Sequence, residues 1–184
     1  MSHLFTPLQL RQVTFRNRIF VSPMCQYSSR DGMPTDWHLV HLGSRAAGGA
    51  GLVMVEATAV TPEGRISPTD SGIWSDSHGQ AFRRITAFIC EQGAVPAIQL
   101  AHAGRKASTA APWDGDKSVP SEAGGWQPIA PSAIPFGPTS PVPREMTRQD
   151  ITQTIDAFRS ATRRSLDAGF QVVELHVAHG YLLH

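Results

Sequence analysis

The segment HVAHGY (residues 176–181) holds the residues of this sequence best suited to chemistry, namely His176, His179 and Tyr181. Two imidazoles on one turn of chain can donate hydrogen bonds to a single oxygen, which would polarise a carbonyl group and stabilise a developing enolate. The phenol two residues further on can donate a proton. Two other interpretations stay open: a histidine pair without a chemical role, and a metal site, because imidazole is the commonest metal ligand.

Other polar or reactive side chains follow short apolar runs elsewhere in the chain. The Cys25 thiol is suited to tuning a redox cofactor or acting as a nucleophile, or it packs as a small apolar group. Gln99 donates and accepts at once, which suits the uracil-like edge of a flavin, or it caps a strand. Further residues at such positions are Tyr27, Glu56, Ala57, Thr58, His102 and Glu174, with Arg105 and Lys106 close behind.

The same local pattern occurs three times, at residues 44–58, 89–102 and 166–179. Each stretch reads as a helix end, a glycine where a C-terminal cap belongs, and a near-continuous apolar run. Such runs are typical of strands that are buried on both faces. An earlier run, RIFVSPMC (residues 18–25), predicts a first strand without a preceding helix.

Helices are predicted between these strands, at residues 36–47, 75–92 and 147–168. The second begins with Ser75 and Asp76, and the third with Thr147 and Asp150, which are favoured helix-starting residues. In the third helix four residues recur at helical spacing and predict one apolar face. They are Ile151, Ile155, Phe158 and Thr162.

The alternation of strands and helices predicts a parallel sheet with right-handed crossovers. A doubly wound nucleotide-binding sheet is disfavoured, because SPMCQY follows the first strand in place of a glycine-rich turn. We therefore predict a (β/α)8 TIM barrel, of which the four strands are the first half, so that residues 1–184 form the N-terminal half of one domain. Residues 4–17 are expected to form a hairpin that closes the bottom. The long loop 103–146, with Trp113 and Trp126, is expected to be functional.

The composition narrows the class of protein further. With 41% hydrophobic and 17% charged residues, the chain can bury a sizeable core. A net charge of +1 gives no reason to expect nucleic acid or an anionic membrane as the main partner. Two cysteines make no disulfide framework, and neither a secretory signal nor a membrane-spanning run is visible. We expect a soluble, cytoplasmic protein.

Several motifs together resemble a known family. SPMCQYSSRDG, VEATAV, GRISP, GIWSD, IQLAHAGRKA, APSAI and ELHVAHGYL are similar to motifs of the Old Yellow Enzyme family of FMN-dependent ene-reductases, and occur in the same order. The resemblance is narrower to the xenobiotic-reductase, or thermophilic-like, branch. It covers nearly the whole chain and implies a TIM barrel with FMN at its C-terminal face, as the alternation of elements predicts independently.

The resemblance also implies roles for individual residues. His176, His179 and Tyr181 would be catalytic, with the two histidines binding the substrate carbonyl oxygen and Tyr181 donating a proton. Tyr27 would border the substrate pocket. The residues implied to contact FMN are Pro23, Met24, Cys25, Ala57, Gln99 and His176.

The implied reaction is an NADPH- or NADH-dependent reduction of the C=C bond of an α,β-unsaturated carbonyl compound, an activated alkene, with FMN as the cofactor. In its full-length form the protein is expected to be a homo-oligomer. The family's second half, which supplies a basic residue near the flavin and the FMN phosphate site, is absent, so we expect low solubility and weak FMN retention. Two alternatives are an inactive truncated half-barrel and a metal-dependent barrel hydrolase that uses His102, His176 and His179.

Overall fold

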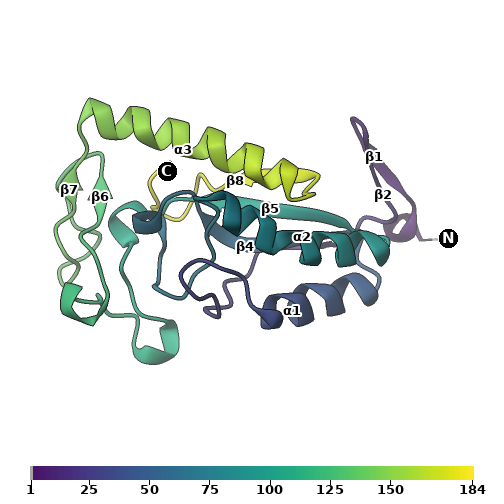
Figure 1. Cartoon of the computed structure of the whole chain (residues 1–184), viewed down its shortest axis with the longest axis horizontal. Coiled ribbons are helices and arrows are strands. Elements are labelled where there is room, and N and C mark those ends of the chain that lie inside the picture. Colours follow the sequence, from purple (N-terminus) through teal and green to yellow (C-terminus); the bar gives the residue numbers. More distant parts are fainter. Residues whose placement is uncertain (1) are drawn as a thin grey trace.

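A four-stranded parallel sheet forms the centre of the computed structural model, which describes residues 2–184 (Figure 1). The strands lie in the order β3, β4, β5, β8, so spatial order follows chain order, as in successive strands of a β/α barrel. Their bounds are Phe20–Val21, Leu52–Ala59, Val95–Ala101 and Val172–Leu175. The four predicted strands and their parallel arrangement are therefore confirmed.

Three long helices cover one face of this sheet (Figure 1). They are α1 (Asp36–Ala47), α2 (Asp76–Glu91) and α3 (Arg148–Asp167), each within one residue of its predicted bounds. At the start of α3 the Asp150 N–H donates to Thr147 Oγ1, and the Thr147 N–H donates to the Asp150 carboxylate. This reciprocal pair of hydrogen bonds provides acceptors for two backbone N–H groups that have no partner within the helix.

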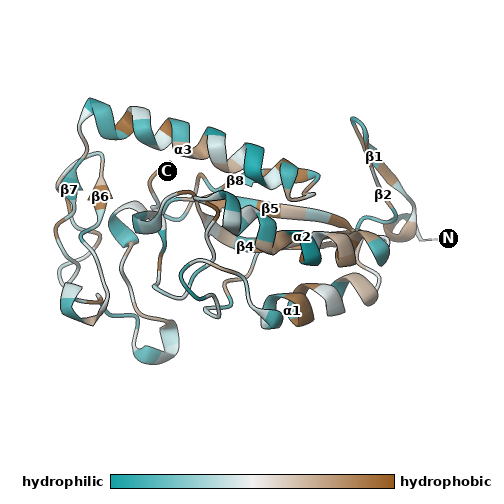
Figure 2. Ribbon diagram, viewed as in Figure 1, coloured by the Kyte–Doolittle hydropathy of each residue, from teal (hydrophilic) through white to brown (hydrophobic). Residues whose placement is uncertain are grey.

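The main core lies between the sheet and the helices. On the strands its residues alternate, as Val53 and Val55 do on β4 and Ile98 and Leu100 on β5, and none of these four is exposed to solvent. They pack against apolar residues of the helices, among them Leu42, Ala46, Phe82, Ile85, Ile89 and Ala161. Figure 2 shows the hydrophobic colour on the central strands and much of the hydrophilic colour on the outer surface of α3.

A second, smaller cluster lies on the other face of the sheet, at the amino ends of the strands. Phe15 packs there among four strand residues, Leu52, Met54, Val95 and Ala97. Phe15 belongs to an antiparallel hairpin of β1 (Leu8–Leu10) and β2 (Val13–Phe15), which follows the one-turn helix η1 (His3–Phe5). The predicted hairpin thus exists and covers the end of the sheet opposite the candidate site (Figure 1).

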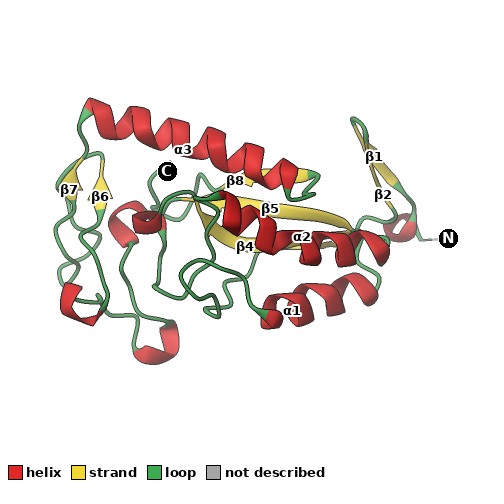
Figure 3. Cartoon of the chain, in the orientation of Figure 1, coloured by secondary structure: helices red, strands yellow, loops and turns green. Residues whose placement is uncertain are grey.

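The long connection between β5 and α3 has little regular structure (Figure 3). It contains three one-turn helices, η3 (Gly104–Lys106), η4 (Pro112–Asp114) and η5 (Ser121–Ala123), and a short parallel pair, β6 (Ile129–Ala130) and β7 (Arg144–Glu145). Trp126 anchors it to the connection after β4, which includes η2 (Pro62–Gly64), because its indole N–H donates to Glu63 O and its ring stacks on the Arg65 guanidinium. Trp74 stacks on the same guanidinium.

Two sequence-based predictions were wrong in detail. The strand predicted at residues 18–25 is only Phe20–Val21, because Pro23 has no N–H to donate to a ladder. The apolar face predicted for α3 is correct only in part. Phe158 packs against the core, but Ile151 and Ile155 are 48% and 56% exposed, and the buried positions of the helix are Thr154, Ala161 and Ser165. Only small side chains fit at these buried positions, because the helix lies close to α2 and β5.

Within residues 2–184, none of the helices combines the length and the apolar character that crossing a membrane requires.

The contrast between α2 and α3 yields a test of the core. Ile89→Ala removes a side chain with no exposure, so the free energy of unfolding should fall by about 2–4 kcal/mol. Ile155→Ala is the matched control in the exposed row of α3 and should change it by less than about 1 kcal/mol. Urea unfolding followed by circular dichroism measures both, and equal losses would contradict the assigned core.

Candidate active site

The carboxyl ends of the strands present one row of side chains on the face of the sheet away from the helices. The strand register pairs Ala57 of β4 with Gln99 of β5, and Gln99 with Glu174 of β8. Gln99 Nε2 donates to Glu174 Oε1 at 2.5 Å, which leaves the Gln99 carbonyl oxygen free to accept from a ligand. Ala57 and Gln99 are buried, so the row offers a small apolar position beside a polar one.

A bulge in β4 makes this row possible. Val55 pairs with Ile98 and Ala57 pairs with Gln99, so Glu56 is an extra residue in the ladder. Without the bulge, the carboxylate of Glu56 would stand opposite Gln99 in place of the Ala57 methyl group. The position of Glu56 near the strand end is predictable from the sequence, whereas the bulge is not.

The histidine pair lies immediately after β8. The His176 N–H donates to Leu100 O at 2.9 Å, which continues the ladder and fixes His176 at the strand end. The His176 and His179 rings are perpendicular, with His179 Nδ1 and His176 Nε2 3.2 Å apart and hydrogen-bonded. The Tyr181 ring lies edge-on to His176, with ring centroids 4.9 Å apart. The structure thus brings all three predicted catalytic residues together.

Burial keeps His176 and Tyr181 neutral. Loss of hydration lowers the pKa of His176, and the neighbouring His179 and Lys106 lower it further. Burial also raises the pKa of Tyr181, and the nearby acidic groups Cys25 and Asp70 act in the same direction. At neutral pH the site therefore contains a neutral imidazole and a phenol, both able to donate a hydrogen bond.

Lys106 holds the turn that carries His179. Its Nζ donates to His179 O at 3.2 Å and lies 5.1 Å from the centroid of the Tyr181 ring. His179 has a φ of +61°, a left-handed conformation that is costly for a residue with a Cβ. Lys106 also lines an open pocket of about 770 Å³ together with Arg105, Tyr27 and Tyr181. The sequence placed Lys106 near the site but did not reveal this contact.

The segment after β3 forms a further wall. Cys25 is half-buried, and burial, with Asp70 and Glu56 nearby, raises its thiol pKa to about 12. The sulfur is therefore a thiol at neutral pH, which disfavours the nucleophile interpretation. Tyr27 lies edge-on to Trp113, with centroids 5.1 Å apart, and burial raises its pKa to about 12. Pro23 is half-buried and Met24 is exposed.

His102, the third histidine of the metal-site alternative, has a structural role. Its Nδ1 accepts from the Gly104 N–H at 3.1 Å, and its carbonyl oxygen accepts from the Leu182 N–H at 3.0 Å. Burial lowers its pKa to about 4. Across residues 2–184, no three His, Cys, Asp or Glu side chains are grouped so as to hold a metal ion, so His102 does not join the pair.

The side chains at this end of the sheet fit a flat ring with a polar edge. A buried methyl group, a free amide oxygen and a neutral thiol offer a smooth surface with one hydrogen-bonding side, and paired imidazoles stand beside it. Such a surface suits the isoalloxazine of a flavin and leaves the imidazoles facing a substrate. The fold and the site together define a β/α-barrel protein whose strand ends can seat a flat cofactor next to a hydrogen-bonded pair of imidazoles.

Comparison with known proteins agrees with this class. Residues 3–184 match the NADH:flavin oxidoreductase / NADH oxidase family, and the chain belongs to it. An NADH:flavin oxidoreductase of Gibberella zeae is 50% identical over 98% of this chain and 45% of its own length. An NADPH dehydrogenase of Geobacillus thermodenitrificans is 48% identical over 98% of this chain and 49% of its own length.

Solved structures extend the similarity to the fold. The Old Yellow Enzyme homologue from Zymomonas mobilis superposes with a TM-score of 0.80 at 34% identity, over 98% of this chain and 50% of that one. The chain thus spans about half the length of the relatives that it matches. The resemblance to the Old Yellow Enzyme family and the predicted half of a TIM barrel are both confirmed.

The contact between Lys106 and the histidine turn can be tested by titration. Lys106→Met removes a positive charge that lowers the pKa of His176, so the His176 midpoint should rise toward its ordinary value near 6.5. Lys117→Met removes the same charge from an exposed position of the same pocket. Lys117 is not among the groups that shift the pKa of His176, so this variant should leave the midpoint in place. The proton shift of His176 Hε1 against pH, measured by NMR, reports both, and an unchanged midpoint in Lys106→Met would remove Lys106 from the site.

Proposed function

We propose that residues 1–184 form the N-terminal half of one FMN-binding barrel domain in an NAD(P)H-dependent oxidoreductase that reduces the C=C bond of α,β-unsaturated carbonyl compounds. The observation that carries the proposal is the convergence of His176 Nε2 and His179 Nδ1, 3.2 Å apart, beside the Tyr181 ring. A carbonyl oxygen that enters between the two nitrogens would accept a hydrogen bond from each ring once the ring that accepts in the resting pair changes tautomer, so that its nitrogen also carries a proton.

The chain's own residues then have distinct tasks. His176 and His179 hold the substrate oxygen, and their N–H groups stabilise the negative charge that gathers on it as the alkene is reduced. Because the pKa of His176 is lowered, the imidazole donates without first gaining a proton. Tyr181, whose pKa is raised, keeps its proton until it can deliver it to the α-carbon. Tyr27 borders the pocket through which the substrate enters.

The cofactor would rest on the row at the strand ends. FMN, when bound, supplies the hydride chemistry and is itself reduced by NADPH or NADH. Ala57 would support the ring from the sheet, and Gln99 would accept a hydrogen bond from its pyrimidine edge through the free amide oxygen. The segment that carries Pro23, Met24 and Cys25 would lie along the ring, with His176 approaching it from β8. The names of the relatives, NADH:flavin oxidoreductase and NADPH dehydrogenase, support this choice of cofactors.

The first experiment asks whether this chain retains the cofactor. The purified chain is mixed with FMN and desalted, and its visible absorption spectrum is recorded. A retained oxidised-flavin spectrum that NADPH or NADH bleaches and 2-cyclohexenone restores would establish the activity in this chain. A colourless protein would contradict it and assign the chemistry to a longer chain, with the inactive half-barrel as the remaining alternative. The same series with both nicotinamides compares the two donors.

A second experiment addresses the histidine pair in the flavin-loaded protein. His179→Ala removes one of the two proposed donors to the substrate oxygen, so reoxidation of the flavin by 2-cyclohexenone should slow by about 10²–10³-fold. Reduction by NADPH should change much less. His3→Ala, at the opposite end of the sheet, is the matched control and should leave both half-reactions unchanged. Equal slowing of both half-reactions by His179→Ala would contradict a specific role toward the carbonyl.

A further inference from the structure

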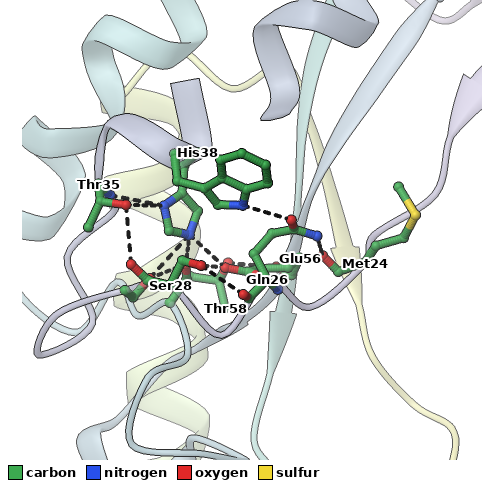
Figure 4. A network of polar contacts seen from close by, with 10 residues as sticks. Met24, Gln26, Ser28, Thr35, His38, Glu56 and Thr58 are labelled. Carbon is green, nitrogen blue, oxygen red and sulfur yellow. Dashed lines mark hydrogen bonds and ion pairs between the residues drawn. The ribbon is translucent and has the colours of Figure 1, made fainter. Parts of the chain in front are cut away.

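A buried carboxylate lies beneath the segment that carries Cys25 and Tyr27. Glu56 is the extra residue of the β4 bulge and is 3% exposed. One carboxylate oxygen accepts from Ser71 Oγ at 2.6 Å and from His38 Nε2 at 2.9 Å, and the other accepts from the backbone N–H of Gln26 (Figure 4). Glu56 therefore joins β4 to the start of α1, to the connection after β4 and to the segment after β3.

The hydrogen bonds around His38 assign its protonation. Its Nδ1 accepts from the Thr35 N–H at 2.9 Å, so this nitrogen carries no proton. Nε2 must then carry the proton that His38 donates to Glu56. The contact is thus a hydrogen bond from the imidazole N–H to the carboxylate, which accepts from three donors and has no Lys or Arg in contact among residues 2–184. Three donors are sufficient to stabilise a buried carboxylate as an anion.

The segment held by Glu56 has a backbone conformation that requires support. Tyr27 has a φ of +50°, which is unfavourable for a residue with a Cβ. The Gln26 N–H has Glu56 as its acceptor, and the Gln26 side chain accepts from Trp37 Nε1 at 3.0 Å. Both anchors, one on β4 and one on α1, hold Gln26, the residue between Cys25 and Tyr27.

We propose that Glu56 is a positioning residue: its anionic carboxylate fixes the turn from Cys25 to Tyr27 through the Gln26 amide, and its charge acts on the Cys25 sulfur. His38 and Ser71 orient the carboxylate for this task. Any effect of this turn on the cofactor rests on the proposed function, in which Cys25 would lie along the flavin. The positioning of the turn by Glu56 does not depend on it. Glu56 itself touches neither substrate nor cofactor.

Several titratable groups face Cys25 from the surrounding elements. Asp70, in the connection after β4, and Glu56 are the two carboxylates that act on the thiol. Tyr27 on its own segment and Tyr181 after β8 interact with it electrostatically. His38 is bonded to Glu56, and His41 lies one turn further along α1. Of these, Glu56 is the one that both bonds to the segment of Cys25 and carries a charge.

The charge can be measured at Cys25 without any cofactor. In a Cys90→Ser background, which leaves Cys25 as the sole thiol, alkylation rates are compared for anionic iodoacetate and neutral iodoacetamide. Their ratio cancels accessibility and reports the local charge. Glu56→Gln should raise the iodoacetate-to-iodoacetamide ratio roughly two- to fivefold, because a negative neighbour is lost. Ser71→Ala, which removes a donor to the same carboxylate and leaves its charge, is the matched control and should not change the ratio.

The alkylation ratio separates the effect of the Glu56 charge from a loss of packing. An unchanged ratio in Glu56→Gln, with both rates raised equally or not at all, would overturn the proposal, because loss of packing alone affects the two reagents alike. If Glu56→Gln does not fold, amide exchange in the unsubstituted chain decides. The Gln26 amide should exchange far more slowly than the Met24 amide, which has no acceptor among residues 2–184. Equal exchange at the two positions would overturn the proposal.

A last measurement connects the turn to the reaction. In the flavin-loaded protein, Glu56→Gln should lower kcat with 2-cyclohexenone about tenfold while KM changes less, because a displaced wall misaligns the reacting groups without removing the binding donors. Ser44→Ala, at an exposed position of α1 outside this network, is the control and should stay within about twofold. If the chain retains no flavin, the proposed function of this chain fails. Amide exchange at Gln26 then still decides whether Glu56 holds the turn, and the alkylation ratio decides whether its charge acts on Cys25.

Discussion

The register of the parallel strands is the constraint on which the site depends. In a parallel sheet, residues that pair across neighbouring strands point to the same face, so Ala57, Gln99 and Glu174 meet in one row although they are far apart in sequence. A slip of one residue would turn Gln99 toward the helices and bring Ile98 to the site. The fully buried valines and leucines on the helix-facing side prevent such a slip, because their exposure would cost about 1.5–3 kcal/mol each.

Local signals in the sequence were sufficient to predict the elements and most of the row. Thr147 and Asp150 mark the start of α3, and the apolar runs after each glycine mark the strands. The orientation of α3 was not predictable in this way, because Ile151 and Ile155 fit the helical period as well as the buried residues do. The small side chains that face the core are chosen by the distance to the neighbouring elements, which periodicity does not report.

The candidate catalytic residues were recognisable because they lie in one short segment. The residues that support them come from distant parts of the chain and have no signal of their own. His38 reads as an ordinary helix residue until the structure shows that one nitrogen caps α1 and the other bonds to Glu56. The bulge at Glu56 is also not predictable from the sequence, because a strand with one extra residue has the same kind of composition as a strand without it.

Burial determines the charge of the groups around the site. It keeps His176, Tyr181 and Cys25 neutral at physiological pH and raises the pKa of Asp70 to about 7. In the proposed reaction, His176 and Tyr181 could therefore donate to a developing negative charge on the substrate without first losing a counterion. At Glu56 three hydrogen-bond donors of the protein take the place of the water that burial removed from the carboxylate.

The closed set of partners around Glu56 has an evolutionary consequence. Loss of Glu56 alone leaves three buried or half-buried donors without an acceptor, and loss of His38 alone leaves a buried anion with one donor fewer. Joint replacement of the three side chains by apolar residues removes two of these donors but still leaves the Gln26 N–H without its acceptor. Across related sequences, positions 38, 56 and 71 should therefore be conserved together, even where the surrounding helices diverge.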